Sequence, residues 1–191
     1  MLTPAVARDP SVPSAFPLGL PFGVPGRFID YALQAERERR LADALASRRF
    51  AVRERFGAHL GAALGRQGVV PVATPAPRFD PVPLDRLPAW DADALLDPVL
   101  EEFGFAASTP EGPFVPFAVG LIRLRGRDGR VLREERVAVN VVRPPSLTFV
   151  VGPQEPRFGR DVPFHEEADR AAAGVDAALR SLAREIAARV R

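Results

Sequence analysis

The stretch AVGLIRLRGRDGRVLREERVAV, residues 118–139, carries the strongest structural signal in the chain. Apolar side chains alternate with other residues on both sides of Asp128-Gly129, and this dipeptide favours the tight turn of a β-hairpin. A three-residue loop with Gly129 in the left-handed conformation sets the register of the two strands. The predicted facing pairs are Leu124 with Leu132, Ala118 with Ala138 and Val119 with Val137.

The same stretch contains six arginines, so it must be asked whether it is a basic ribbon for nucleic acid. Such a ribbon would combine uncompensated arginines with aromatic side chains that stack on bases. The stretch has no aromatic residue, and Glu134 and Glu135 lie among the arginines. The predicted register places Arg123 diagonal to Glu135, close enough for compensation. We therefore interpret the arginines as the solvated face of a half-buried hairpin and expect no binding of nucleic acid.

The overall charge supports the same interpretation. The net charge is only +2, although the pI is about 10.2. All 26 cationic side chains other than histidine are arginines, Lys and Cys are absent, and Tyr occurs once. Few groups therefore titrate between about pH 8 and pH 10, and a small positive excess persists to high pH. A cytoplasmic nucleic-acid-binding domain, which would cluster its basic charge, ranks third among the possible functions.

Length and proline content predict one domain with an N-terminal extension. With 191 residues and 47% hydrophobic content, the chain can bury a sizeable core. Its 21 prolines concentrate in segments that we interpret as loops or arms. We predict that residues 1–27 form an extended, Pro-rich arm outside the domain, with an edge strand near residues 17–24. Residues 28–191 are predicted to form a single domain.

The sequence leaves two locations open. The absence of Cys excludes a disulfide, a thiol nucleophile and a thiolate metal site within these residues. The N-terminus lacks a basic region followed by an apolar one, so it does not resemble a signal peptide. Residues 16–26 are apolar but contain three prolines and fall far short of the ~20 residues of a membrane span. We expect either a cytoplasmic protein or an exported one whose signal is missing from this chain.

Residues 28–47 carry a thin apolar stripe and are expected to form a helix or a mobile segment. Two further segments have the apolar spacing of helices, residues 51–67 and 166–190. The last is the most regular, and its apolar stripe consists of Val175, Leu179, Leu182, Ile186 and Val190. Asp176–Arg180 and Glu185–Arg189 are i,i+4 ion pairs in the favourable order. We expect the stripe to pack on the hairpin face that carries Leu124, Leu132, Ala118 and Ala138. The alternative is a detached helix that binds a membrane or a partner.

Shorter strands are predicted at residues 69–73 and 146–152, whereas residues 93–105 are ambiguous. Their apolar residues fit a period of two and a period of 3.6 equally well. Pro98 would be tolerated at the first position of a helix capped by Asp97, which favours a short helix over residues 97–103. As a strand, the segment would have to place Pro98 at an edge or a bulge.

No motif predicts a catalytic residue, a bound metal or a cofactor. His59 is expected on the side of a helix, partly buried or at the surface. His165 precedes Glu166 and Glu167, but the segment lacks the i,i+4 histidine pair of a zinc helix. No serine lies in a G-x-S-x-G motif, and a P-loop is impossible without Lys.

The densest carboxylates lie between Asp91 and Glu102, and a carboxylate-based enzyme site there is the alternative function. Trp90 precedes them and is expected either to anchor a long loop or to mark a partner contact. The weak candidates for binding are Trp90, Asp91, Asp93, Arg123 and Arg125.

Several phrases of the chain resemble uncharacterised proteobacterial lipoproteins of the cell envelope. These are DALLDPVLEEFGFAAS at 93–108, PFVPF at 113–117 and a strand that ends in RVAVN at 136–140. That group is similar to periplasmic accessory lipoproteins with a small α/β sheet, such as the curli-secretion, penicillin-binding-protein-activator and TolB N-terminal types. The resemblance covers about residues 50–190 and implies a strand at 93–105. It implies no catalytic residues, and this chain shows no lipobox.

Together these observations predict an α+β fold. A mixed, largely antiparallel sheet of four or five strands is expected to be packed on one face by the 51–67 and 166–190 helices. The expected function is that of a non-enzymatic protein of the periplasm or of the periplasmic side of the outer membrane, which binds other envelope proteins or itself. A membrane tether would require a lipid-anchored Cys upstream of these residues.

Overall fold

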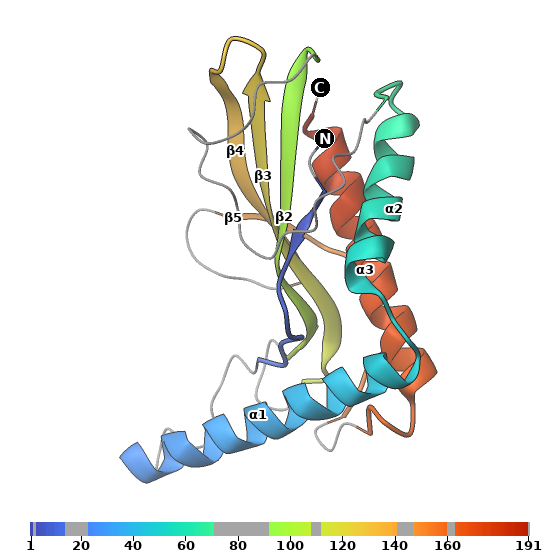
Figure 1. The fold of residues 1–191 in the computed structure, drawn as a ribbon. Helices are drawn as coiled ribbons and strands as arrows, with labels where there is room; N and C mark the ends of the chain where they lie inside the picture. Colours follow the sequence, from blue (N-terminus) through green and yellow to red (C-terminus); the bar gives the residue numbers. More distant parts are fainter. Residues whose placement is uncertain are drawn as a thin grey trace.

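The computed structural model describes residues 1, 3–13, 23–70, 92–107, 112–140, 147–159 and 163–190. Within these residues, five strands form one sheet, and three helices lie along one side of it or across its end (Figure 1). The sheet is mixed but largely antiparallel, which confirms the predicted α+β class.

The strands follow one another across the sheet in chain order. β1 (Ala5–Val6) pairs in parallel with β2 (Ala94–Ala106), which continues antiparallel into β3 (Val115–Gly126) and β4 (Val131–Val139). β5 (Leu147–Val150) then pairs in parallel with the C-terminal half of β4. The predicted strand after the hairpin is therefore confirmed, and the centre of the sheet is the meander of β2, β3 and β4.

β2 is a strand, as the two-sided apolar pattern and the resemblance indicated. Pro98 lies neither at a sheet edge nor in a bulge but in regular register opposite Ile122, and the bulge follows Leu100. The carbonyl of Leu100 accepts a hydrogen bond from the N-terminal segment, and Pro98 faces the same side because backbone groups repeat every two residues. Its missing amide hydrogen therefore removes no bond to β3.

The hairpin forms as predicted at its turn but not along its length. Gly129 has a φ of +84°, in the left-handed region. A register shift beside Arg125 moves all pairs beyond it by one residue, so that Leu124 faces Arg133 instead of Leu132. The predicted pairs are wrong beyond this bulge, because nothing in the alternating pattern marks the extra residue.

α3 (Ala168–Ala188) packs directly on the sheet, and its apolar stripe is buried as predicted. Val175, Leu179, Leu182 and Ile186 are all fully buried. Leu182 approaches β3 so closely that a Cβ atom on Gly120 would lie 3.0 Å from its Cδ2 atom. The absence of a side chain at Gly120 thus lets the helix lie close to the strand.

The face that receives α3 differs partly from the predicted one. Ala118 and Leu124 belong to the same core as α3, as expected. Ala138 instead joins a separate cluster on the other side of the sheet, and Leu132 is 54% exposed. The one-residue shift in register explains the difference, because neighbouring residues of a strand point to opposite faces.

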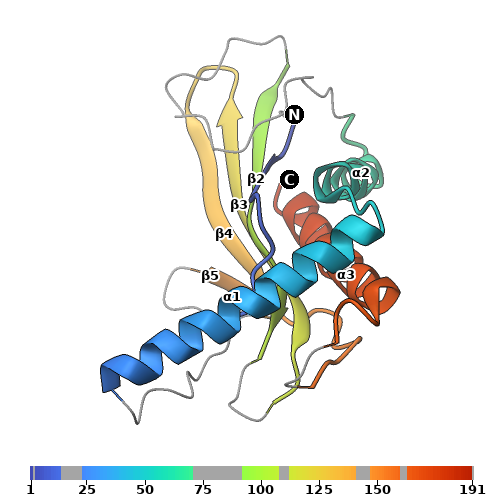
Figure 2. The same ribbon diagram turned by 60° about the horizontal axis from the view of Figure 1, so that its bottom comes forward.

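The other two predicted helices are also present. α2 (Val52–Gly65) lies beside α3 and buries Phe56 and Leu60 in the same core. α1 (Gly23–Ser47) crosses the end of these two helices, and its C-terminal half buries Leu41 and Leu45. Its N-terminal half extends away from the sheet and from the other two helices (Figures 1 and 2).

The N-terminal segment takes part in the domain instead of running outside it. Ala5 and Val12 are fully buried, and Ser11 bridges to Gly104 of β2. Because α1 begins at Gly23, the boundary expected after residue 27 falls inside a helix.

Two predicted short strands fall mainly outside the described residues. This applies to residues 17–22 of the edge strand expected near 17–24 and to residues 71–73 of the strand expected at 69–73. Val69 and Val70 belong to no strand, and Val70 is 86% exposed.

Replacing Gly104 tests how the N-terminal segment is held. Gly104 has a φ of +145°, and an added Cβ would lie 2.0 Å from the carbonyl oxygen of Ser11. Gly104→Ala is expected to cost more than the roughly 1–3 kcal/mol of backbone strain alone, because Ser11 must also move away. Thermal unfolding should show a midpoint lowered by several degrees. Hydrogen exchange should show loss of protection at the Phe105 amide, which donates to Ser11.

Gly61→Ala in α2 is the matched control, because an added Cβ there meets nothing within 4 Å. Alanine should stabilise the helix by about 0.5–1 kcal/mol. An unchanged midpoint for Gly104→Ala would mean that residues 5–12 do not depend on contact with β2.

Candidate functional site

The predicted binding residues lie in different environments. Trp90 and Asp91 lie outside the described residues. Asp93 is exposed just before β2, and its carbonyl accepts a hydrogen bond from the Arg127 amide. Arg125 is partly buried and bends over the hairpin turn, where its Nε donates to the carbonyl of Gly129 at 2.5 Å. The side chain of Arg125 therefore supports the turn.

Arg123, the remaining candidate, forms an ion pair with Asp97 inside the sheet. Asp97 is fully buried and Arg123 is 7% exposed, so the prediction of a solvated face is wrong for this arginine. The two residues face each other on β2 and β3, on the side away from α3, because Leu96 and Ile122 point into the α3 core. The acid that compensates Arg123 is therefore Asp97 and not Glu135.

We interpret this buried pair as a constraint on the register of β2 against β3. Removing a charge from water costs several kcal/mol, and mutual attraction offsets that cost only where the geometry is good. The Nε atom of Arg123 is buried and has no hydrogen-bond partner among the described residues. The net contribution of the pair to the free energy of folding is therefore small. A one-residue slip of β2 against β3 would leave both charges buried and apart from each other.

The described carboxylates of the alternative enzyme site are spread along β2. Asp93 and Asp97 are four residues apart, which is about 13 Å along a strand. Glu101 pairs with Arg136 of β4 at 3.0 Å, and Glu102 is half-buried. Among the described residues, Asp97 and Glu101 pair with different arginines, and the carboxylates of β2 do not converge on one point.

A second polar cluster joins α2 to α3 around Asp176, which is 8% exposed. His59 Nε2 lies 2.9 Å from Asp176 Oδ1, and Arg180 donates to Oδ2 at 2.8 Å. Arg55 approaches the same carboxylate at 3.5 Å. The i,i+4 pair of Asp176 and Arg180 was predicted, but its link to α2 was not.

The charge of Asp176 is stabilised by these neighbours. Burial raises its pKa, but the hydrogen bonds and charges of His59 and Arg180 outweigh burial, so the pKa lies below its usual 3.8. Asp176 is thus ionised at neutral pH and fixes three cationic or hydrogen-bonding side chains on the helix surface. Sequence alone could not find this cluster, because His59 and Asp176 are 117 residues apart.

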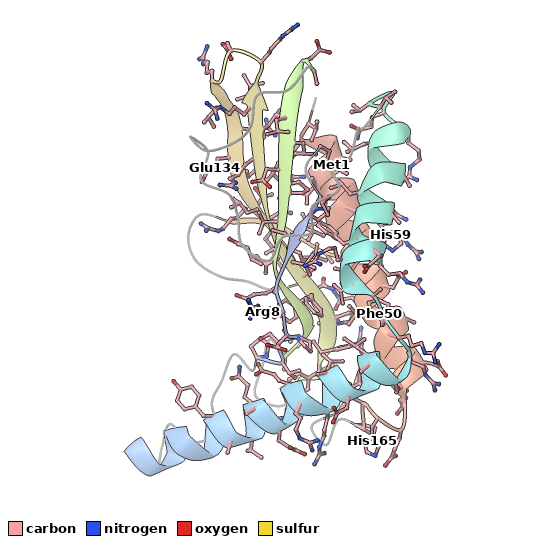
Figure 3. All side chains as sticks on the ribbon, in the orientation of Figure 1. Met1, Arg8, Phe50, His59, Glu134 and His165 are labelled. Carbon is pink, nitrogen blue, oxygen red and sulfur yellow. The ribbon has the colours of Figure 1, made fainter. Side chains whose placement is uncertain are left out.

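A pocket of about 510 Å³ adjoins the Asp176 cluster between α2 and α3. It is lined by His59, Ala62, Arg66, Arg180 and Arg184. Figure 3 places His59 on α2, next to the C-terminal helix. The lining therefore carries three arginines, and the neighbouring carboxylate, Asp176, already contacts Arg180 and His59.

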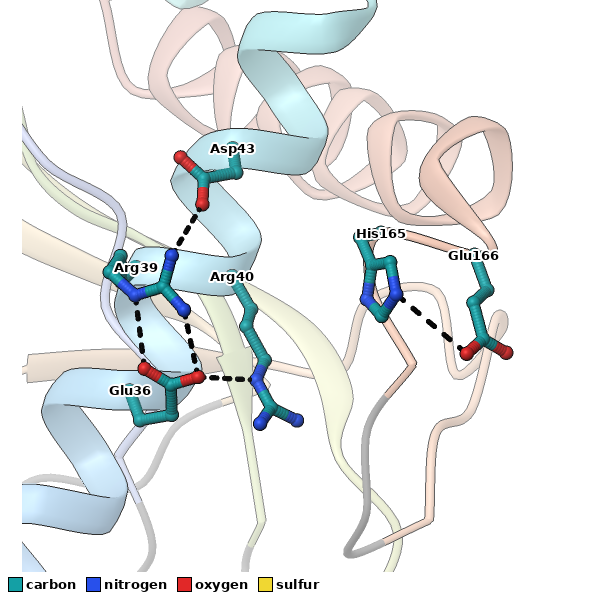
Figure 4. Close-up of polar contacts among 6 residues, drawn as sticks. All are labelled: Glu36, Arg39, Arg40, Asp43, His165 and Glu166. Carbon is teal, nitrogen blue, oxygen red and sulfur yellow. Dashed lines mark hydrogen bonds and ion pairs between the residues drawn. The ribbon is translucent and has the colours of Figure 1, made fainter.

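Charged side chains also form a ladder on α1 (Figure 4). Glu36 accepts hydrogen bonds from Arg39 and Arg40, which lower its pKa to about 2, and Arg39 also pairs with Asp43 at 2.9 Å. Such i,i+3 and i,i+4 contacts between exposed side chains support a helix only weakly. His165 lies on a nearby turn, exposed, 3.7 Å from Glu166.

Comparisons with protein-family models, curated proteins and solved structures find no match to this chain. Among the described residues, no three acidic, histidine or cysteine side chains are placed to hold a metal ion. None of the described helices is long and apolar enough to cross a membrane. The expected lack of a metal and of a cofactor stays a prediction.

Substitutions at the Asp97–Arg123 pair test its role. Arg123→Met leaves a buried carboxylate without its guanidinium partner and is expected to destabilise the protein by about 3–5 kcal/mol. The double variant Asp97→Leu/Arg123→Met should recover most of that loss, because both buried charges are gone. Urea unfolding measures the three free energies.

The control is Arg136→Met, which breaks a more exposed pair with Glu101 and should cost at most about 1 kcal/mol. A double variant as unstable as Arg123→Met would show that the pair itself contributes the stability, contrary to our interpretation.

The low pKa of Asp176 predicts how stability depends on pH. A carboxylate whose pKa is depressed by folding contributes stability above its unfolded pKa, and the contribution is lost as pH falls through the folded pKa. Asp176→Asn should therefore lower the free energy of unfolding by about 1–3 kcal/mol near neutral pH. The difference from the wild type should shrink below about pH 4.

Asp169→Asn on the same helix is the control, since Asp169 pairs with Arg48 while its side chain is 82% exposed. Urea unfolding at several pH values should show little effect of Asp169→Asn throughout. A difference for Asp176→Asn that persists unchanged in acid would exclude the proposed linkage.

Proposed function

We propose that the protein is a non-enzymatic interaction or assembly module of the cell envelope, which binds other envelope proteins or further copies of itself. The observation that supports this proposal is the N-terminal half of α1, which extends beyond the sheet and the other helices (Figure 2). Helix α1 has 25 residues and is therefore about 37 Å long.

The extending part of α1 exposes apolar side chains. Tyr31 is 71% exposed and Leu33 is 41% exposed, while Ala32 and Ala35 are also exposed. Residues two apart lie on nearly opposite sides of a helix, so apolar surface is presented in more than one direction. An exposed helical segment is marginal in water, and a partner would supply further contacts. Exposed Tyr is also a residue type enriched among the anchors of protein interfaces.

The base of α1 is held firmly. Leu41 is fully buried, and Glu38 accepts hydrogen bonds from Gln34 at 2.9 Å and from the backbone amide of Val12 at 3.2 Å. The guanidinium of Arg37 lies over the ring of Phe114, 5.2 Å from its centre. These contacts fix the direction of the helix, so that binding through its free half costs less ordering entropy.

The envelope location rests on the resemblance to periplasmic accessory lipoproteins. Such a protein would act in the periplasm or on the periplasmic side of the outer membrane, and a tether would come from a lipid-anchored Cys upstream of these residues. The α+β sheet and the strand at 93–105 agree with the fold that the resemblance implies. That agreement concerns the fold, and the location itself is part of the proposal.

Substitution of the exposed apolar residues tests the docking role. Tyr31→Ser/Leu33→Ser is expected to weaken self-association or partner binding by at least tenfold, roughly the effect of one anchor residue. Analytical ultracentrifugation measures self-association. Crosslinking from a photoreactive residue at position 33, in cells of the source organism, measures contact with other envelope proteins.

Leu132→Ser is the matched control, because Leu132 is an exposed apolar residue on the hairpin, away from α1. It should leave both measurements unchanged. A wild-type chain that stays monomeric at high concentration and forms no crosslink from position 33 would refute the docking role of α1.

A further inference from the structure

The pocket between α2 and α3 has an excess of positive charge at its rim. Arg66 and Arg184 are exposed, and neither has an acidic partner among the described residues. Arg180 shares Asp176 with His59 and Arg55, so that one carboxylate faces several cations. The acid nearest in sequence to Arg184 is Glu185, and it pairs instead with Arg189 at 2.7 Å. The lining therefore retains net positive charge.

The pocket is also pre-organised. Asp176 is more than nine-tenths buried and holds Arg180 through its Oδ2 atom, while His59 is fixed through Oδ1. Ala62 lies between His59 and Arg66 on the exposed side of α2 and leaves the space above it open. An anion that enters would meet Arg180 in a position that is already partly set, which reduces the ordering cost of binding.

We propose that this pocket binds the phosphate group of a phosphorylated small molecule through Arg66, Arg180 and Arg184. Guanidinium groups donate paired hydrogen bonds that match phosphate oxygens, and several of them can surround a tetrahedral dianion. A volume of about 510 Å³ exceeds that of phosphate alone and leaves room for the organic group that carries it. Volumes of roughly 300–1,000 Å³ are usual for small-molecule sites.

This role is independent of α1, because the pocket is formed by α2 and α3 alone. The phosphate can come from a soluble metabolite or from a lipid headgroup, and the chemistry of the three arginines is the same for both. If the pocket binds no phosphate, the docking role of α1 is unaffected. If α1 has no docking role, the phosphate site is likewise unaffected.

Calorimetric titration at constant ionic strength tests the site with glycerol 3-phosphate as the soluble probe. Sedimentation with phosphatidylcholine vesicles, with and without phosphatidic acid, is the lipid arm. We expect saturable binding in at least one arm, and Arg184→Gln should weaken it by about tenfold, the effect of one charged hydrogen-bonding partner. The thermal midpoint should stay unchanged, because Arg184 is exposed and has no ion pair among the described residues.

Arg130→Gln is the control, because it removes one exposed arginine at the hairpin turn, away from the pocket. It should leave the affinity unchanged. The proposal is overturned if neither arm binds, or if Arg130→Gln weakens binding as much as Arg184→Gln.

Discussion

The close contact between α3 and β3 is the constraint on which the rest of the molecule depends. Leu182 approaches Gly120 so closely that a Cβ atom there would lie 3.0 Å from its Cδ2 atom, so any other residue would require Leu182 to shift. This distance places the buried stripe of α3 on the inner face of the meander and creates the main core. Because α2 packs mainly on α3, its position depends on this contact, whereas α1 is also held by Val12 and Phe114 where it crosses the end of α3 (Figure 1).

Polar links add direction to this apolar packing. Asp169 at the start of α3 pairs with Arg48 just after α1. Asp176, about two turns further along α3, lies 2.9 Å from the His59 ring of α2. Hydrophobic contacts are non-directional and would tolerate some sliding of one helix along another. A partly buried carboxylate with defined partners tolerates much less, because sliding would leave its charge unpaired. The alignment of α2 on α3 therefore depends on Asp176, whereas the exposed pair of Arg48 and Asp169 adds little to the orientation of α1.

Local patterns were sufficient for most of the fold, whereas pairings across the sheet were not. The helical stripes, the Asp128-Gly129 turn and the sheet class all follow from short-range spacing, which requires no knowledge of distant residues. The bulge beside Arg125 shifts the register without a signal in the alternating pattern, and it changes which hairpin residues face α3. Arg123 was assigned to solvent for a different reason. Its partner Asp97 lies 26 residues earlier, on a strand whose identity was itself ambiguous. Of the candidate site, sequence spacing revealed the Asp176–Arg180 pair, but not His59 beside it or the arginines around the pocket.

The distribution of charge shows why composition could not reveal a binding surface. A net charge of +2 on a chain with 26 arginines implies that most cations have acidic neighbours, and many here do. Arg123 is neutralised inside the sheet, Arg136 by Glu101, and Arg189 by Glu135 and Glu185. Among the described residues, Arg66 and Arg184 have no acidic partner. Their charges create a local electrostatic field that a low net charge does not cancel at short range. Arg66 and Arg184 come from different helices, so they face a common space only because Leu182 fixes α3 on the sheet and Asp176 fixes α2 on α3.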